Sequence, residues 1–167
     1  MWLRYPRFKS DLNAAHVQQF AEETGPERGR RRDALTVLDE SGVWLAGPDA
    51  TLYTGLAAHR WQEVLWQRRE AVRQTLRVAV IGHALLEKAL APYASMTGKC
   101  LWLGDAADAE AAACDALIHL TSPRALAPLP VQGLPGWDAA NADARFYANA
   151  DIFRPAPRRL SAAGTTA

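Results

Sequence analysis

The order of apolar and polar residues divides the chain into short predicted elements. Residues 10–23 predict a helix in which His16 lies between apolar neighbours, as a core histidine would. The aromatic segment Met1–Phe8 precedes this helix. The Gly- and Arg-rich residues 24–31 follow it and predict a loop, either as a plain solvated connection or as an anion-binding loop.

Two apolar runs in the next stretch are typical of strands. Ala34–Asp39 and Val43–Ala46 flank a short Gly-containing connection and predict a β-hairpin. In this interpretation Gly42 supplies the positive φ that the turn needs. Residues 54–69 then have apolar positions at helical spacing and a charged outer face, which predicts an amphipathic helix.

The middle of the chain predicts a strand, a helix and a second strand in close succession. Leu76–Ile81 is apolar and β-branched and ends at Gly82, and the strong helix former His83–Ala91 follows and ends before a proline. Lys99–Leu103 again has the composition of a strand. These three elements span about 28 residues, which is the size of a βαβ unit.

The last part of the chain combines one helix with a proline-rich segment. Asp105 is expected to cap a helix whose alanines and leucines repeat at helical spacing. Residues 124–157 alternate prolines with isolated aromatic and leucine residues, which indicates an arm that wraps the domain, with a short helix near residues 142–148. Residues 158–167 are expected to be disordered. The whole pattern predicts one mixed domain over residues 1–157, α+β or α/β in class, with three to four helices.

Composition narrows the classes of partner and compartment. The formal net charge is +1, which gives no reason to expect nucleic acid or an acidic membrane surface as a partner. No apolar run approaches the ~18 residues of a membrane span, and no basic-then-apolar signal segment opens the chain. Cys100 and Cys114 match neither a disulfide framework nor a zinc motif, so they are interpreted as small buried residues. The cytoplasm is the expected location.

The best candidate site is the predicted strand-to-helix turn at Gly82-His83. His83 would lie where a strand ends and a helix begins, and in open α/β sheets ligands bind outside the carboxyl ends of the strands. Glu87 follows one turn later on the same face of a helix that is otherwise apolar. No phosphate-binding glycine fingerprint, metalloprotease helix motif or nucleophile elbow accompanies this turn, and no cofactor is evident.

Three interpretations of His83 and Glu87 remain open. In the structural one, Glu87 pairs with an arginine or Lys99 and His83 caps its helix. In the catalytic one, Glu87 orients His83 as a general acid or base, supported by Asp33 or Asp39 from the predicted hairpin. In the metal one, His83 and Glu87 are two metal ligands four residues apart. A catalytic zinc site usually has three ligands from the protein, so one ligand would be lacking. The candidate ligand-binding residues are Arg32, Lys88, Trp137 and Asn141.

Several stretches together resemble one bacterial family, the domain of unknown function numbered 3025. They are LRYPRFKSDLNAAH, RRDALTVLDESGVWLA, VIGHALLEKALAPYASMTGKCLWL and PLPVQGLPGWDAANADARFYANADIFRP. The resemblance covers most of the chain, from about residue 2 to residue 157. Members of that family look longer at the N-terminus, by a segment with a Trp-His-Asp type motif that is missing here. The resemblance implies no activity and leaves the chemistry open.

Two classes of function fit these observations, and the sequence leaves open whether the protein is an enzyme. The first is an intracellular acid–base or hydrolase-like enzyme that acts on a small molecule at a site centred on His83 and Glu87. The alternative is a non-catalytic module that binds a partner or assembles with itself through the aromatic N-terminus and the arm. Self-assembly would make the protein a homo-oligomer. A third idea, nucleic-acid binding through Arg28–Arg32, has only a basic run without aromatic residues in its favour.

Overall fold

The fold is built on a four-stranded mixed sheet. The computed structural model describes Ala14 and residues 26–157. Within them the strands are β1 (Gly42–Ala46), β2 (Arg77–Val80), β3 (Thr97–Trp102) and β4 (Ala127–Pro130), in the order β2-β1-β3-β4. β1 and β3 run parallel, and the two outer pairs are antiparallel. The predicted class, a single mixed α/β domain, is confirmed.

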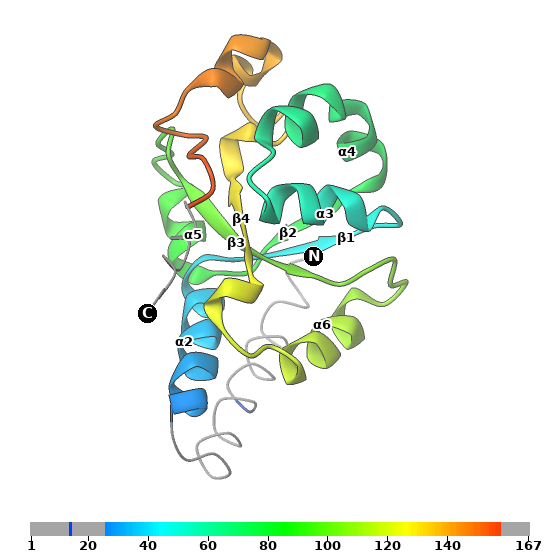
Figure 1. Cartoon of the computed structure of the whole chain (residues 1–167), viewed down its shortest axis with the longest axis vertical. Helices are drawn as coiled ribbons and strands as arrows, with labels where there is room; N and C mark the ends of the chain where they lie inside the picture. The colour runs from blue at the N-terminus through cyan, green and yellow to red at the C-terminus, as the bar shows by residue number, and fades with distance from the viewer. Residues whose placement is uncertain (1–13, 15–25, 158–167) are drawn as a thin grey trace, which may run out of the picture.

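Helices cover both faces of the sheet (Figure 1). The α-helices are α2 (Pro26–Ser41), α3 (Ala50–Ala57), α4 (Arg69–Thr75), α5 (His83–Lys88) and α6 (Ala109–Ile118). The π-helical segment η1 (Gln62–Gln67) lies between α3 and α4. Four short 3-10 turns complete the set, η2 (Pro123–Ala125), η3 (Val131–Gly133), η4 (Ala139–Ala142) and η5 (Ala144–Ala148).

The alternation of side chains along the strands produces two apolar clusters, one on each face. Val43 and Leu45 of β1 face the larger cluster with α3, η1, α4 and the arm. Leu101 and Leu103, on and just after β3, face the second cluster with α2 and α6. Both clusters consist largely of side chains that are almost fully buried, so each face of the sheet is a packed core.

The predicted hairpin strand Ala34–Asp39 is wrong, because these residues belong to helix α2. The buried positions of this segment are Ala34, Leu35 and Leu38, which is helical rather than strand spacing. The β-branched residues Thr36 and Val37 favoured a strand locally, and packing of the helix against the sheet overrides that preference. The predicted loop at residues 24–31 is likewise helical from Pro26 onward.

Gly42 does not supply the positive φ that was predicted for it. Among the described glycines only Gly104 and Gly136 have positive φ. A Cβ on Gly42 would instead lie 2.2 Å from the Leu38 carbonyl oxygen, so glycine is needed where β1 leaves the end of α2. The strand prediction Val43–Ala46 itself is confirmed by β1.

The predicted helix over residues 54–69 is present but interrupted. α3 ends at Ala57, and His59 takes a left-handed conformation with φ 57° before the chain becomes helical again. The His59 ring is held there by the Arg154 carbonyl oxygen, 3.0 Å from its Nδ1. Contact with the arm therefore fixes a break that the sequence pattern does not reveal.

The strand-helix-strand prediction is right in its elements and wrong in their pairing. β2, α5 and β3 occur in the expected order. However, β1 lies between β2 and β3 in the sheet, and β2 is antiparallel to β1. The three elements therefore do not form a βαβ unit, and the parallel pair of the sheet is β1 with β3.

The arm packs against the larger apolar cluster and also extends the sheet. Its first part forms β4, which pairs with β3, and the short helix expected near residues 142–148 is η5. Leu134, Tyr147 and Phe153 of the arm are buried in the larger cluster. The helix before the arm is α6, and the side chain at its start that accepts a backbone N–H is Asp108 rather than the predicted Asp105.

Some predictions concern residues outside the described ranges. They are the aromatic segment Met1–Phe8, the helix over residues 10–23 with His16, and the tail 158–167. In the part of the chain that is described, no helix is long and apolar enough to cross a membrane.

Candidate functional site

Two glycines position His83 against the end of helix α2. Gly82 precedes the first residue of α5, and a Cβ there would lie 2.4 Å from the backbone N of Gly42 and 2.5 Å from the carbonyl O of Glu40. The backbone N–H groups of Ile81 and Gly82 both donate to the Gly42 carbonyl, at 3.0 Å each. The turn after β2 therefore packs closely against the α2–β1 junction. His83, the first residue of α5, lies beside the last turn of α2.

His83 contacts Asp39 in two ways. Its Nδ1 lies 2.9 Å from the Asp39 carbonyl oxygen and 3.4 Å from the Asp39 carboxylate Oδ2. Because a carbonyl oxygen can only accept, Nδ1 carries the proton of the neutral ring and Nε2 has an open lone pair. The His83 side chain is 47% exposed and that of Asp39 is 27% exposed, so the pair is accessible from solvent.

The other candidates on α5 and α2 do not join this pair. Glu87 and Lys88 are exposed, and within the described residues neither forms a hydrogen bond or an ion pair with His83. Asp33 and Arg32 are also exposed, on the same helix as Asp39. At 1.5 Å per residue, Asp33 lies about 9 Å before Asp39 along the helix axis. The structure therefore brings together His83 and Asp39, with Glu87 and Lys88 further along α5.

The edge of the sheet at which His83 lies differs from the expected one. His83 follows the carboxyl end of β2, but β2 runs antiparallel to β1. His83 therefore lies near the amino ends of the parallel strands β1 and β3, whereas ligands in open α/β sheets bind at the carboxyl ends. That rule does not support a site at His83, and the case for it depends on the contact with Asp39.

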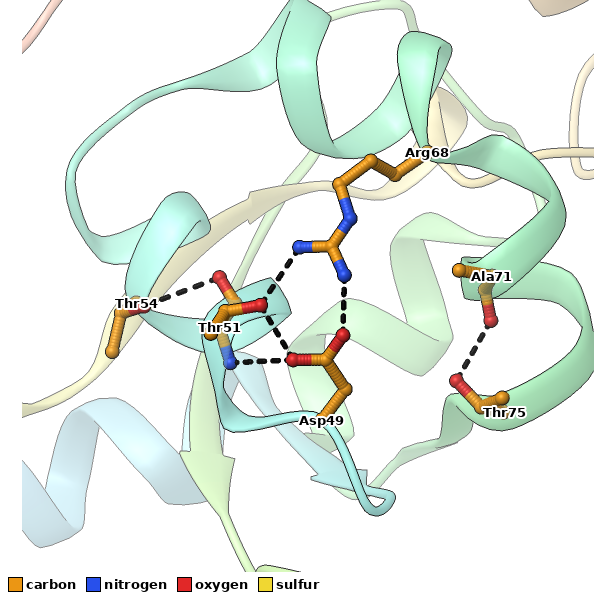
Figure 2. Close-up of polar contacts among 6 residues, drawn as sticks. All are labelled: Asp49, Thr51, Thr54, Arg68, Ala71 and Thr75. Atoms are coloured by element: carbon orange, nitrogen blue, oxygen red, sulfur yellow. Dashed lines mark hydrogen bonds and ion pairs between the residues drawn. The ribbon is translucent and has the colours of Figure 1, made fainter.

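A polar cluster of Asp49, Thr51 and Arg68 occupies the carboxyl end of β1 (Figure 2). The Asp49 carboxylate accepts from the Thr51 backbone N–H at 2.9 Å and caps α3. It also accepts from the Thr51 hydroxyl and pairs with Arg68, which donates to the Thr51 hydroxyl oxygen at 2.8 Å. The Thr51 hydroxyl and N–H hold the pKa of Asp49 below its ordinary value, and Arg68 adds to this effect.

This cluster fastens the start of α3 to the start of α4, and its groups satisfy one another. Asp49 was not among the candidate residues that the sequence suggested. An aspartate just before a helix, with threonine two residues later, is a capping signal that would have identified Asp49. No comparable local signal identifies Arg68 as its partner.

A separate pocket opens between α4, β2 and the arm. It has a volume of about 290 Å³ and is lined by Val72, Arg73, Leu76, Val78, Leu134, Pro135 and Trp137. Trp137 is 52% exposed at this pocket. Asn141, in contrast, is buried, and its side-chain amide donates to the carbonyl oxygens of Gln132 and Leu134 at 2.7 and 2.6 Å. Asn141 thus supports the turn that carries Trp137.

The described residues hold no group of three or more His, Cys, Asp or Glu side chains placed to bind a metal ion. Cys100 is buried and forms no disulfide, and burial raises the pKa of its thiol. Cys114 is half-buried on α6. The cysteine thiols therefore add no group to the pair at His83.

A comparison with models of known protein families shows to which family the chain belongs. A family model described as "Protein of unknown function (DUF3025)" matches residues 1–158. The chain belongs to the DUF3025 family. Neither the curated proteins nor the solved structures that were compared include a match. The His83–Asp39 pair, the Asp49 cluster and the pocket at Trp137 all lie within the range that the DUF3025 model matches.

The His83–Asp39 pair, the Asp49 cluster and the pocket of this DUF3025 domain differ in what they can do chemically. The Asp49 cluster is internally satisfied and suits a structural role. The His83–Asp39 pair presents one nitrogen lone pair to solvent and can take up or give a proton at that atom. The pocket combines apolar side chains of the core with an exposed arginine and an exposed tryptophan, and can hold a ligand.

Proposed function

We propose that this protein is an intracellular acid–base enzyme that acts on a small molecule, with His83 as the general base and Asp39 as the residue that positions it. The observation that carries the proposal is the 2.9 Å contact between His83 Nδ1 and the Asp39 carbonyl oxygen, together with the carboxylate Oδ2 at 3.4 Å. This arrangement fixes the tautomer and the ring orientation, as the third group of a catalytic triad does.

In this proposal the reactive atom is Nε2 of His83. It accepts a proton from a water molecule or a substrate hydroxyl, and the ring becomes an imidazolium whose Nδ1–H still faces the Asp39 carbonyl and carboxylate. The carboxylate stabilises that positive charge, and the proton returns to the leaving group in the second half of the reaction. Hydrolysis of an acyl or phosphoryl compound with a poor leaving group uses both proton transfers, and a compound with a good leaving group needs only the first.

The intracellular part of the proposal is supported by the cysteines. Cys100 is a buried free thiol on strand β3, which suits a reducing compartment.

The experiment measures hydrolysis of chromogenic small molecules by the purified full chain and its variants. The substrates are p-nitrophenyl esters of short and medium acids, p-nitrophenyl phosphate and a phosphodiester. The variants are His83→Gln and the matched control His119→Gln, which removes an exposed histidine at the end of α6. Glu87→Gln tests whether the carboxylate on α5 takes part.

We expect hydrolysis of at least one substrate class to fall by about 100-fold or more in His83→Gln, because general acid–base groups contribute at least that factor. His119→Gln and Glu87→Gln are expected to retain the wild-type rate. Equal rates in the wild type and His83→Gln would contradict the proposal, as would the absence of any hydrolysis that exceeds the buffer rate. A loss in Glu87→Gln as large as in His83→Gln would move the positioning role from Asp39 to Glu87.

A further inference from the structure

We infer that the pocket between α4, β2 and the arm binds a small molecule with a flat aromatic ring and one anionic group, such as an aromatic carboxylate. This site is separate from the proposed function, because His83 and Asp39 are not among its lining residues. The inference depends on the walls of the pocket, the two side chains at its rim, and the way in which the arm is held.

Most of the lining side chains are apolar and pack in or against the core, and the surface that the pocket leaves open is more polar than apolar. Val72 and Leu134 are buried members of the larger apolar cluster, and Leu76 and Val78 pack against that cluster. The volume of about 290 Å³ is roughly twice the ~150 Å³ of an apolar cavity that binds benzene, so it suits a body of two fused rings. Walls fixed by the core keep the pocket open without a ligand.

The rim carries Arg73 from α4 and Trp137 from the arm, and both are exposed. In the described structure neither the Arg73 guanidinium nor the Trp137 indole N–H has a polar partner. A guanidinium binds a carboxylate through two parallel hydrogen bonds, and an indole face stacks on an aromatic ring. The rim therefore selects negative charge on a flat ligand.

The turn that presents Trp137 is held rigid from behind. Asn141 donates to the Leu134 carbonyl oxygen at 2.6 Å, and its Oδ1 accepts from the Gly136 N–H at 3.3 Å. The Tyr147 hydroxyl donates to the Gly133 carbonyl oxygen at 3.0 Å. A turn that is fixed by buried polar groups and yet exposes a tryptophan loses little conformational entropy when a ligand binds.

The test uses three probes with the same ring system and different charge. They are naphthalene-2-carboxylate, 2-naphthylmethylamine and 2-naphthalenemethanol. Their binding to the full chain is followed by the indole N–H signal of Trp137 in ¹H–¹⁵N spectra, which the Trp137→Phe variant assigns by its disappearance. Titrations then give Kd for the wild type, Arg73→Gln and the control Arg124→Gln, which removes an exposed arginine outside the pocket.

We expect the carboxylate to bind about tenfold more tightly than the alcohol or the amine, to shift the Trp137 signal, and to lose about tenfold in affinity in Arg73→Gln. Arg124→Gln and His83→Gln should bind it as the wild type does. Equal affinity for the carboxylate and the amine would overturn the inference. Unchanged affinity in Arg73→Gln, or an unmoved Trp137 signal at millimolar carboxylate, would do so as well.

Discussion

Replacement of Gly82 by alanine tests the junction that holds His83 beside Asp39. The φ and ψ of Gly82 are −69° and 124°, values that alanine adopts freely, so the backbone conformation itself adds no strain. The added Cβ would lie 2.4 Å from the Gly42 backbone N and 2.6 Å from the Glu40 carbonyl carbon. Both neighbours are backbone atoms, and they cannot rotate away as a side chain would.

The expected cost follows from these two contacts. Inserting a methyl group into a packed interior costs about 1–3 kcal/mol, and the upper end applies here because the β2–α5 turn has to move away from α2. The lower entropy of the unfolded alanine chain offsets about 0.5 kcal/mol of this cost. We therefore expect Gly82→Ala to lower the free energy of unfolding by about 2–3 kcal/mol.

Urea unfolding followed by tryptophan fluorescence measures this change, with equal m-values as the check that both proteins unfold alike. The matched control is Gly29→Ala in helix α2, where a Cβ would meet nothing within 4 Å. That variant is expected to be more stable than the wild type by about 0.5 kcal/mol, because alanine is the better helix former. A Gly82→Ala protein as stable as Gly29→Ala would refute the close approach of the two segments.

Three further predictions test other parts of the structure. Thr36→Ala is expected to stabilise the protein by a few tenths of a kcal/mol in urea unfolding, because Thr36 is exposed on helix α2; a loss of stability would favour a strand there. Asn141→Ala is expected to cost about 3 kcal/mol, since it removes three hydrogen bonds of a buried amide, to the Gln132 and Leu134 carbonyl oxygens and from the Gly136 N–H, whereas the exposed Asn149→Ala should cost far less; similar costs would contradict this reasoning. Asp49 has a lowered pKa in the folded state, so its contribution to stability is present above its unfolded pKa and is lost as the pH falls through the folded one. The wild type should therefore lose more stability than Asp49→Asn between about pH 6 and pH 3, and parallel losses would show that the carboxylate is not held.

Much of the fold was predictable because several elements carry their signal locally. The apolar runs that became β1, β2 and β3 are bounded by glycine or proline, and the helix after Gly82 has strong helix formers throughout. The order of the strands was not predictable in this way. Antiparallel pairing of β2 with β1 joins residues 31 to 37 positions apart, and no turn residue specifies such a pairing.

Helix α2 shows how local preference misleads. The β-branched pair Thr36-Val37 favours a strand, and only the spacing of Ala34, Leu35 and Leu38 indicates a helix. Burial of those three side chains against the sheet decides between the two patterns. A local reading of this segment therefore selected the weaker of its two signals.

The sequence suggested both residues of the candidate pair but not the contact between them. His83 and Asp39 were both candidates, but Glu87 was expected as the partner because it is the carboxylate one helical turn away. Asp39 reaches His83 through the α2–β1 junction, which no pairwise spacing in the sequence reveals. Arg73 was not a candidate at all, since an exposed arginine on an amphipathic helix is ordinary until the arm places Trp137 beside it.

The most direct test of the central claim is a double-mutant cycle of kcat/KM with His83→Gln, Asp39→Asn and the double variant, on the substrate that gives the largest wild-type rate. If Asp39 acts through His83, Asp39→Asn should lower kcat/KM by about tenfold in the wild type, because the carbonyl contact remains while the carboxylate charge is lost. The same change should have no effect in the His83→Gln background. An equal loss in both backgrounds would show that the two residues act independently and would contradict the claim.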